Sequence, residues 1–247
     1  MNNNILAVTV LALGLSTTPL NADEKTFVYI SNAGDGTITG FQLGDDGNLE
    51  SAGTTEVAAL VMPMAASPDG KVLYAATRAE PFTLYAWHVS PQDGSLDLLD
   101  TAPLGHNMLY VSTDRSGQYL LAASNSSNVI TVTALDEEGR PASEPLFTQP
   151  TRHYTHAIRT NHLNTLAFAP TLGENAVEQF RFDVEAGALS HNEPQLAAIG
   201  EGAGPRHFVY SPDDRHLYVV NQFMGSVAGF VIDQTSGTLA PLGIFDA

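Results

Sequence analysis

The stretch SPDDRHLYVVNQFMGSVAGFVIDQTSGTLAPLG, residues 211–243, decides the fold. It contains short runs of alternating apolar and polar residues, separated by segments rich in Asp, Asn, Gly and Pro. Asp and Asn side chains hydrogen-bond to their own backbone, and Gly supplies positive φ, so these segments are typical of hairpin turns. No amphipathic helical period is sustained, and the stretch therefore predicts antiparallel β-strands.

The run HLYVVN belongs to a set of similar runs that recur along the chain. They are FVYISN (27–32), VLYAAT (72–77), YLLAAS (119–124), TLAFAP (165–170) and HLYVVN (216–221). Aligned in register they are 45, 47, 46 and 51 residues apart. A turn of similar composition precedes the last four: SPDG (67–70), STDRSG (112–117), RTNHLN (159–164) and SPDDR (211–215). A period of about 45 residues with four antiparallel strands is the signature of a β-propeller blade, so we predict an all-β propeller of about five four-stranded blades.

The number of repeats raises the question of how such a propeller closes. No inner strand is evident before residue 27, and the chain ends in LAPLGIFDA (239–247), an outer-strand segment. A ring that does not pair its ends leaves exposed strand edges. Either five blades close imperfectly, or the chain is a C-terminally shortened version of a longer protein. We favour the second alternative, an open or incomplete ring.

The N-terminal segment MNNNILAVTVLALGLSTTPLNA predicts export. Its apolar run, residues 5–15, is too short to span a bilayer, and the small-residue end at Ala22 fits a signal-peptidase site. We therefore expect a signal peptide over 1–22 and a propeller domain over 23–247. The mature protein is then periplasmic or secreted and does not associate with the membrane, whereas an unprocessed leader leaves it cytoplasmic.

The composition excludes several classes of function. Ten basic residues stand against 27 acidic ones, giving a formal net charge of −17, so nucleic acid and anionic membrane surfaces would be repelled. The chain has no cysteine, which excludes disulfides, thiolate catalysis and cysteine-based metal sites. HExxH, GxSxG and phosphate-loop motifs are also missing from the sequence, and we expect neither a metal nor a cofactor.

A group of basic and polar residues is predicted to meet at one rim of the propeller channel. Arg206 and His207 follow a Gly-Pro turn at the start of an inner strand. The next strand runs back and ends at Asn221 and Gln222, which should therefore lie at the same rim. His156 occupies the equivalent inner-strand start in the preceding repeat. A positive charge attracts an anion more strongly in a concave, partly desolvated place than in open water. The group of basic residues therefore favours an anionic ligand.

Arg78 follows the strand at 72–77 and is predicted to point toward the same rim. Each candidate also has a structural alternative. Arg206 could bind neighbouring backbone carbonyls, His156 could serve only as a structural hydrogen-bonding residue, and Arg78 could form a surface pair with Glu80, which would contribute little. We expect His162, in a turn, to be solvated. We expect the aromatic residues to pack between blades: Tyr74, Tyr85, Trp87, Phe180, Phe208, Tyr218 and Phe230.

Several segments resemble the lactonase family of seven-bladed β-propellers, which includes the propeller-type 6-phosphogluconolactonases and the fungal 3-carboxymuconate cyclases. The resemblance is carried by SPDGKVLYAATRAE (67–80), STDRSGQYLLAAS (112–124) and above all EGAGPRHFVYSPDDRHLYVVNQFMGSV (201–227). It implies hydrolysis of a small-molecule lactone, a sugar or muconate lactone carrying a phosphate or carboxylate, without a metal.

The resemblance also implies roles for the candidate residues. Arg206 with His207 matches the family's GPRH motif, and Arg206 would bind the anionic group or stabilise the developing oxyanion. His156 matches the family's channel histidine and would act as general base or acid. Asn221 and Gln222 would bind substrate, and Arg78 matches an RPEF-like segment.

Two departures from the family pattern keep other functions open. Gln222 stands where the family has a glutamate, and an amide can neither ionise nor transfer a proton. The sixth and seventh blades are also missing. The alternatives to a lactone hydrolase are an exported propeller that binds a ligand or protein without catalysis, and an inactive fragment of a longer lactonase.

Overall fold

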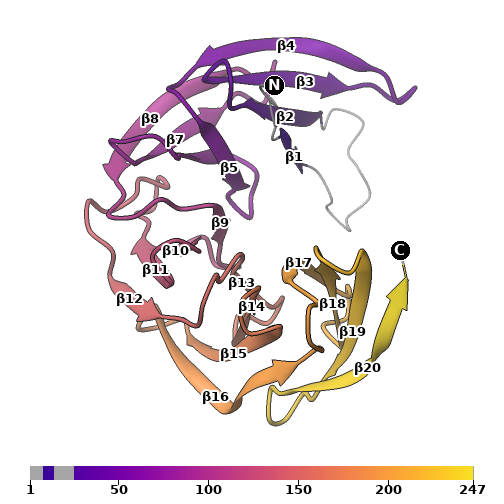
Figure 1. Ribbon diagram of the computed structural model, residues 1–247. Helices are drawn as coiled ribbons and strands as arrows, with labels where there is room; N and C mark the ends of the chain where they lie inside the picture. Colours follow the sequence, from indigo (N-terminus) through magenta and orange to yellow (C-terminus); the bar gives the residue numbers. More distant parts are fainter. Residues whose placement is uncertain (1–7, 14–24, 247) are drawn as a thin grey trace, which may run out of the picture. The chain divides into compact units, whose positions relative to one another are not determined.

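The computed structural model describes residues 8–13 and 25–246, and in this part of the chain every regular element is a β-strand. The strands form five four-stranded antiparallel sheets, each built from strands consecutive in sequence (Figure 1). All five sheets are open, with two edge strands each. The prediction of about five four-stranded blades is therefore confirmed. None of the described residues belongs to a helix capable of crossing a membrane.

The chain divides into two compact units. The N-terminal unit comprises residues 1–108 and 136–143, and the C-terminal unit comprises residues 109–135 and 144–247. The two sheets of the N-terminal unit contain β1 (Val8–Leu13), β2 (Thr26–Asn32), β3 (Thr37–Leu43) and β4 (Leu49–Glu56), then β5 (Val61–Ala66), β6 (Val72–Thr77), β7 (Thr83–Val89) and β8 (Leu96–Pro103).

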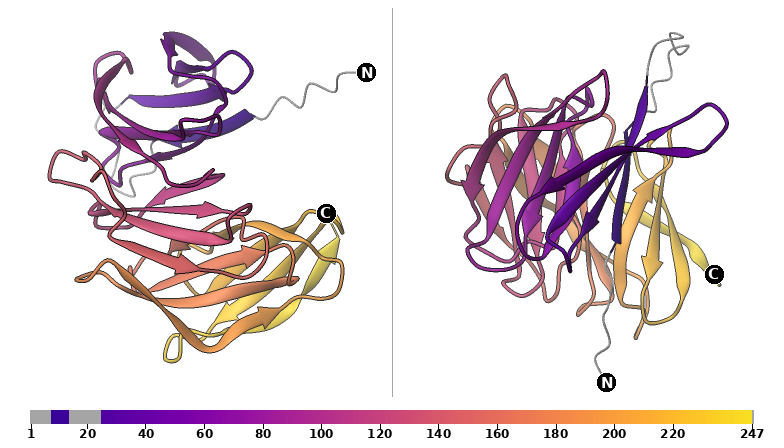
Figure 2. Two further views of the ribbon diagram at one scale, coloured as in Figure 1. Left: turned by 60° about the vertical axis from the view of Figure 1, so that its left-hand side comes forward. Right: turned by 90° about the horizontal axis from the view of Figure 1, so that it is seen from above.

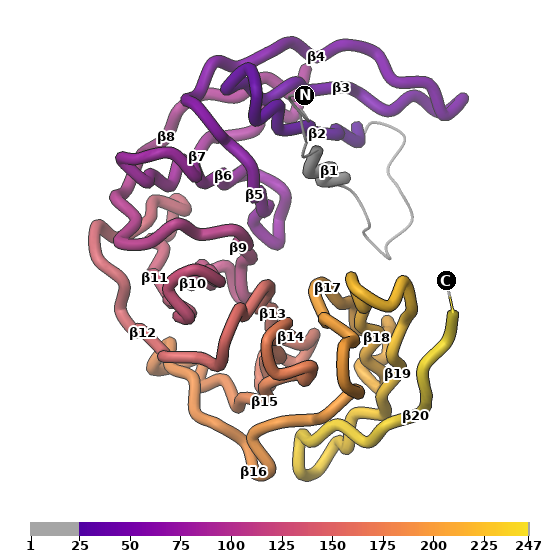
Figure 3. The backbone as a smooth tube through the Cα atoms, viewed as in Figure 1, coloured from indigo at the N-terminus to yellow at the C-terminus, as the bar shows by residue number. Residues whose placement is uncertain are grey.

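The C-terminal unit contains the third, fourth and fifth sheets. Their strands are β9 (Tyr110–Thr113), β10 (Tyr119–Ser124), β11 (Val129–Ala134) and β12 (Phe147–Pro150); β13 (Arg159–Thr160), β14 (Leu166–Thr171), β15 (Ala176–Asp183) and β16 (Ala188–Ala198); and β17 (Pro205–Tyr210), β18 (His216–Asn221), β19 (Ser226–Ile232) and β20 (Leu239–Asp246). Within this unit the first strands β9, β13 and β17 lie on one side, and the fourth strands lie on the other (Figure 3). The repeated runs found in the sequence are the second strands of the five sheets.

The turn between the first and second strands has the same construction in the last four sheets. A polar residue at its first position accepts a hydrogen bond from the backbone N–H five residues later; these residues are Ser67, Asp114, Asn161 and Ser211. The fourth position takes positive φ; these residues are Gly70, Gly117, Asn164 and Asp214. Gly, Asn and Asp are the residue types that tolerate this conformation, so the turn chemistry predicted from the sequence is observed.

The second strands form the centre of the hydrophobic core. Every residue of β6, β10 and β14 is buried. Most of the predicted packing aromatics are also buried, among them Tyr74, Trp87, Phe180, Phe208 and Phe230. Tyr85 is partly buried and stacks on Trp87, with ring centroids 5.4 Å apart.

The fifth sheet differs, and here one aromatic prediction is wrong. Along β18 burial alternates: Leu217 and Val219 are fully buried, whereas Tyr218 is 38% exposed and Val220 is 42% exposed. The buried face packs against the fourth sheet, and the three sheets of the unit lie face against face (Figure 2). The other face of the fifth sheet meets solvent, which is why Tyr218 is not buried between blades.

The first sheet contains a strand that the repeat pattern did not reveal. Val8–Leu13 forms β1 and pairs antiparallel with β2, from Val8 opposite Asn32 to Leu13 opposite Phe27. The first sheet therefore has an inner strand, contrary to the sequence reading. This strand lies inside the predicted leader, and the rest of residues 1–22 lies outside the described residues. The domain boundary at residues 22 and 23 stays a prediction.

Candidate functional site

The turn before β17 places Arg206 and His207 at the start of that strand. Gly204 takes φ +62°, and its carbonyl accepts a hydrogen bond from the backbone N–H of Gln222 (2.8 Å). A side chain at position 204 would collide with the Phe223 ring, because a Cβ there would lie 2.3 Å from it. Pro205 pairs with Asn221 across the two strands. The beginning of β17 and the end of β18 therefore share one end of the sheet, as the sequence predicts.

His156 meets Arg206 across the boundary between the fourth and fifth sheets. The backbone N–H of His156 donates to the carbonyl of Pro170 (2.9 Å), which fixes the residue just before β13. Arg206 donates its Nε proton to His156 Nε2 over 3.0 Å. An imidazole nitrogen that accepts from a guanidinium carries no proton itself, so the neutral ring has its proton on Nδ1. The alternative reading, in which Arg206 binds neighbouring backbone carbonyls, does not describe its Nε, which contacts the His156 ring.

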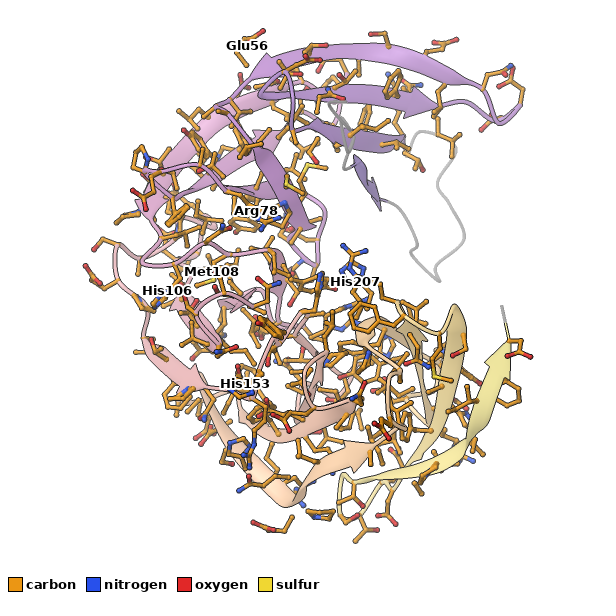
Figure 4. All side chains as sticks on the ribbon, viewed as in Figure 1. Glu56, Arg78, His106, Met108, His153 and His207 are labelled. Atoms are coloured by element: carbon orange, nitrogen blue, oxygen red, sulfur yellow. The ribbon has the colours of Figure 1, made fainter. Side chains whose placement is uncertain are left out.

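His207 completes a compact group with these two residues. Its ring lies edge-on to His156, with centroids 5.0 Å apart. His207 still meets solvent, but the atoms packed around its ring partly desolvate it, and this desolvation together with the neighbouring Arg206 charge lowers its pKa to about 4, so its imidazole is neutral at pH 7. His156 is only 8% exposed, whereas Arg206 and His207 are exposed. His207 lies on the inner-strand side of the C-terminal unit, and His153 lies nearer the outer strands (Figure 4).

Tyr110 is a fourth member of the group, and sequence reasoning missed it. It is the first residue of β9, and its ring packs 5.5 Å from that of His207. Tyr110 occupies the place in the third sheet that His207 occupies in the fifth, four residues before the first residue of the following turn. Comparing the inner-strand starts of all repeats, and not only the basic ones, could have found it.

A buried carboxylate holds the loop that precedes His156. Glu178 on β15 is 1% exposed and accepts from the backbone N–H of Arg152 (2.7 Å) and from the Thr155 hydroxyl (3.5 Å). Burial raises the pKa of Glu178. Tyr154, in the same loop, takes φ +62°, an uncommon conformation for an aromatic residue. Glu178 therefore anchors the backbone that delivers His156 to Arg206.

The other three predicted site residues, Asn221, Gln222 and Arg78, differ in their burial and in their hydrogen-bond partners. Asn221 is fully buried and donates to the Ser226 hydroxyl (3.1 Å), a contact within its own sheet, whereas Gln222 is exposed. Arg78 lies in the N-terminal unit and donates its Nε proton to Asn107 Oδ1 (2.9 Å), so Asn107, not Glu80, is its partner there. The ligand-binding roles of all three residues stay predictions.

The described residues contain no group of three or more His, Asp or Glu side chains arranged to hold a metal ion. The chemistry that the cluster can offer is that of a guanidinium next to a neutral imidazole. The first can bind and stabilise an oxyanion, and the second can accept a proton.

The fold and this cluster together define a β-propeller with an Arg–His group at the start of its inner strands. The family model "Lactonase, 7-bladed beta-propeller" matches residues 26–247. The chain belongs to this lactonase family, as its motifs indicate.

Curated relatives agree with the family assignment. A 6-phosphogluconolactonase of Serratia proteamaculans is 31% identical over 213 residues, which are 86% of this chain and 63% of the relative. One of Pectobacterium atrosepticum is 31% identical over 221 residues, 89% of this chain and 65% of the relative. The chain therefore spans less than two thirds of the length of these relatives.

Solved structures share the fold. The periplasmic gluconolactonase of Pseudomonas aeruginosa matches with a TM-score of 0.75 and 20% identity, over 85% of this chain and 64% of that structure. A protein from Lactobacillus plantarum matches with a TM-score of 0.74 and 19% identity, over 97% of this chain and 67% of that structure.

Proposed function

We propose that the protein hydrolyses a sugar lactone at the cluster of His156, Arg206 and His207. The observation that carries the proposal is the 3.0 Å contact from Arg206 Nε to His156 Nε2. It brings an oxyanion-binding group and a proton acceptor from two adjacent sheets to one point. Family membership and relatives called 6-phosphogluconolactonases support a lactone as substrate.

The reaction uses both groups in turn. Arg206 turns from His156 toward the lactone carbonyl, and this frees the lone pair on His156 Nε2. A water molecule attacks the carbonyl carbon while His156 Nε2 takes its proton, and the oxyanion that forms is stabilised by the guanidinium. The intermediate collapses with cleavage of the ring C–O bond, and the proton on His156 passes to the departing ring oxygen. The product is the open hydroxy acid.

His207 and Tyr110 shape the surroundings of the reacting pair. Because the low pKa of His207 keeps it neutral at pH 7, it adds no second positive charge beside His156. The His207 ring packs against that of His156, and Tyr110 packs against His207, so the His156 ring keeps its position while Arg206 turns toward the lactone. A proton acceptor held in this way contributes to catalysis because it need not be reoriented during the reaction.

The test is the rate of opening of glucono-δ-lactone and of 6-phosphoglucono-δ-lactone, measured against the spontaneous rate. We expect purified protein to accelerate at least one of them. His156→Gln should reduce the acceleration by about 10²-fold or more, the usual contribution of general acid–base catalysis. His88→Gln, at an exposed position on β7, is the matched control and should have no effect. No acceleration, or equal rates for the two variants, contradicts the proposal.

Gln222 supports a second candidate function. The family pattern has a glutamate at this position, and an amide there favours a site that binds its ligand without turning it over. In that case an anionic sugar acid raises the melting temperature while neither lactone is hydrolysed. Gln222→Glu distinguishes the two functions, because restored turnover in this variant identifies the missing carboxylate as the cause.

We also infer export from residues 1–22, consistent with a structural relative described as periplasmic. Cleavage after Ala22 would remove β1, so the same residues cannot serve both as a cleaved leader and as a strand of the mature protein. Expression with the native N-terminus and mass measurement of the product separates these outcomes. A mature protein starting near Asp23 supports export, and an intact N-terminus contradicts it.

A further inference from the structure

The hairpin turn between the third and fourth strands contains a glycine with positive φ in all five sheets. The φ values of these glycines lie between +61° and +87°; they are Gly47, Gly94, Gly139, Gly187 and Gly237. The last four pack against the second strand of the sheet that precedes theirs in the chain. A Cβ at these four positions would lie under 3.0 Å from Phe27, Tyr74, Tyr119 and Leu166, respectively. Each contact therefore requires glycine, which has no side chain.

Hydrogen bonds hold two of these turns in place. The Tyr29 hydroxyl donates to the Gly94 carbonyl (2.7 Å), and the Tyr74 hydroxyl donates to the Gly139 carbonyl (2.8 Å). Both tyrosines are fully buried. The start of a second strand is therefore a turn-binding site, where the glycine turn of another sheet docks.

The turn of the first sheet, residues 44–48, is not docked in this way. It is closed by a hydrogen bond from the Gly47 N–H to the Gly44 carbonyl (2.9 Å). A Cβ at Gly47 would have no atom of the described residues within 4 Å. This turn therefore has the conformation of a docked turn but no strand to dock against.

The apolar residues at the base of the same hairpin are also exposed. Leu43 and Leu49 pair with each other across β3 and β4, and they are 39% and 49% exposed. The corresponding pair in the second sheet, Val89 and Leu96, belongs to a buried cluster that includes Tyr29. Docking of the second-sheet turn covers that pair, whereas the first-sheet pair has no such cover.

The fifth sheet has the converse feature, a turn-binding site without a turn. His216 begins β18 and holds the place of Val72 in β6, because each backbone N–H bonds to the serine five residues earlier (2.9 Å in both). Tyr218 follows two residues later, as Tyr74 follows Val72, and its ring stacks on that of His216 with centroids 6.2 Å apart. Tyr218 is 38% exposed, whereas Tyr74 is fully buried. Since the four docked turns bind to other sheets, the site at His216 and Tyr218 is open.

The charges around the two exposed features are complementary. The first-sheet turn contains Asp45 and Asp46, both exposed. Arg215 lies directly beside the open site, and its side chain is 73% exposed although Asp213 lies 4.0 Å away. A cation has a similar place at the first docked turn, where Lys25 Nζ donates to a backbone carbonyl of the second-sheet turn (2.6 Å). Because the net charge of −17 makes most of the surface repel another copy, this pairing of opposite charges favours one orientation of approach.

We propose that copies of this chain associate head to tail, with the turn 44–48 of one copy bound at His216 and Tyr218 of the next. Gly47 then lies against the His216 ring, and its carbonyl accepts a hydrogen bond from the Tyr218 hydroxyl, as in the docked turns. The turn and its binding site belong to different sheets, so the contact is heterologous and further copies can add. The contact is smaller than a standard interface, so we expect a dissociation constant of about 0.1 mM and separate copies at about 5 µM.

The test is sedimentation velocity of the full chain at about 5 µM and about 500 µM, concentrations on either side of the expected dissociation constant. We expect the wild-type protein to be monomeric at the lower concentration and to form dimers and larger species at the higher one. A monomer at both concentrations overturns the proposal. It also overturns it if the turn binds within its own chain, because that contact does not depend on concentration.

Gly47→Asn tests the turn. Asn tolerates positive φ and the position is open, so the monomer should keep its fold, whereas the added side chain collides with the binding site. We expect association to weaken at least about tenfold. Gly70→Asn is the matched control, because Gly70 also has positive φ (+72°) and open space around it, and Asn164 holds the same turn position in the fourth sheet. The control should associate like the wild type. Equal association of the two variants rejects the turn as the occupant and indicates that the open faces of two fifth sheets pair instead.

Tyr218→Glu tests the binding site, because a carboxylate there repels Asp45 and Asp46. This variant and Gly47→Asn should each stay monomeric alone. An equimolar mixture should form dimers and nothing larger, since one variant keeps an intact site and the other an intact turn, and a mixture that stays monomeric contradicts the proposal. Thermal melts of dilute samples show whether each variant folds. If Tyr218→Glu does not, Tyr218→Phe replaces it: the loss of one hydrogen bond should weaken association about two- to tenfold, and no weakening contradicts the assigned contact.

Discussion

Two adjacent valines on β18 provide a direct test of how the fifth sheet is packed. Val219 is fully buried against the fourth sheet, whereas Val220 points to the opposite face and is 42% exposed. Val219→Ala removes two buried carbon atoms, which cost about 0.8 kcal/mol each in lost burial, and it leaves a cavity. We expect a loss of about 2–3 kcal/mol in the free energy of unfolding. Val220→Ala should cost less than about 1 kcal/mol, mainly from lower strand propensity.

The pair of variants isolates burial from other effects. Both substitutions replace the same β-branched residue on the same strand, so the loss of strand propensity is shared and the difference of about 2 kcal/mol reports packing alone. The assay is urea unfolding followed by far-UV circular dichroism, together with a thermal scan. In a chain of this size the difference corresponds to about 4–8 °C in Tm.

The assay also shows whether the exposed face remains open in solution. We expect the Val220→Ala result to be the same at two protein concentrations tenfold apart. Equal losses for the two variants, or a Val220→Ala effect that grows with concentration, would refute the reasoning. Either result would show that another surface covers this face of the sheet.

Three further predictions concern titration and buried hydrogen bonds. Burial raises the pKa of Glu178, so the folded state holds its proton more tightly than the unfolded chain and stability rises as pH falls toward 4.5. Glu178→Gln should keep the Arg152 contact and flatten this slope between pH 7 and 4.5 in urea midpoints. The pKa of His207 is lowered to about 4, so its contribution to stability is lost as pH falls from about 6.5 to about 4. An NMR midpoint near 6.5 for this imidazole would contradict the geometry. Tyr74→Phe removes the 2.8 Å hydrogen bond to the Gly139 carbonyl and should cost about 1–2 kcal/mol, measured by urea unfolding, whereas no loss would show that the carbonyl finds another partner.

The features that sequence reasoning predicted are local ones or repeats of local ones. The turn positions from Ser67 to Gly70 and their counterparts follow from which residues accept hydrogen bonds and tolerate positive φ. The meeting of Arg206 with His156 was predictable because equivalent positions of neighbouring blades lie side by side. Neither inference requires knowledge of side-chain packing.

The features that were missed depend on contacts between distant parts of the chain. His162 and Asp214 are 52 residues apart, and neither residue type signals that one turn will bind the next. The buried position of Glu178 depends on the loop folded over it, and a carboxylate in a strand usually indicates a solvated face. The exposure of Tyr218 depends on what packs beyond the fifth sheet, which the pattern of its own strand does not contain.

The net charge of the whole chain makes the position of Arg206 important for binding an anion. With a net charge of −17, the average field repels an anionic ligand, and this repulsion extends over about a Debye length of 8–10 Å. Binding such a ligand therefore requires positive groups at direct contact, where local attraction exceeds the average repulsion. Arg206 lies near the start of β17 in the C-terminal unit, with its Nε 3.0 Å from His156 Nε2. Because the chain has only ten basic residues, a guanidinium held against His156 gives this place in an acidic protein a local attraction for an anion.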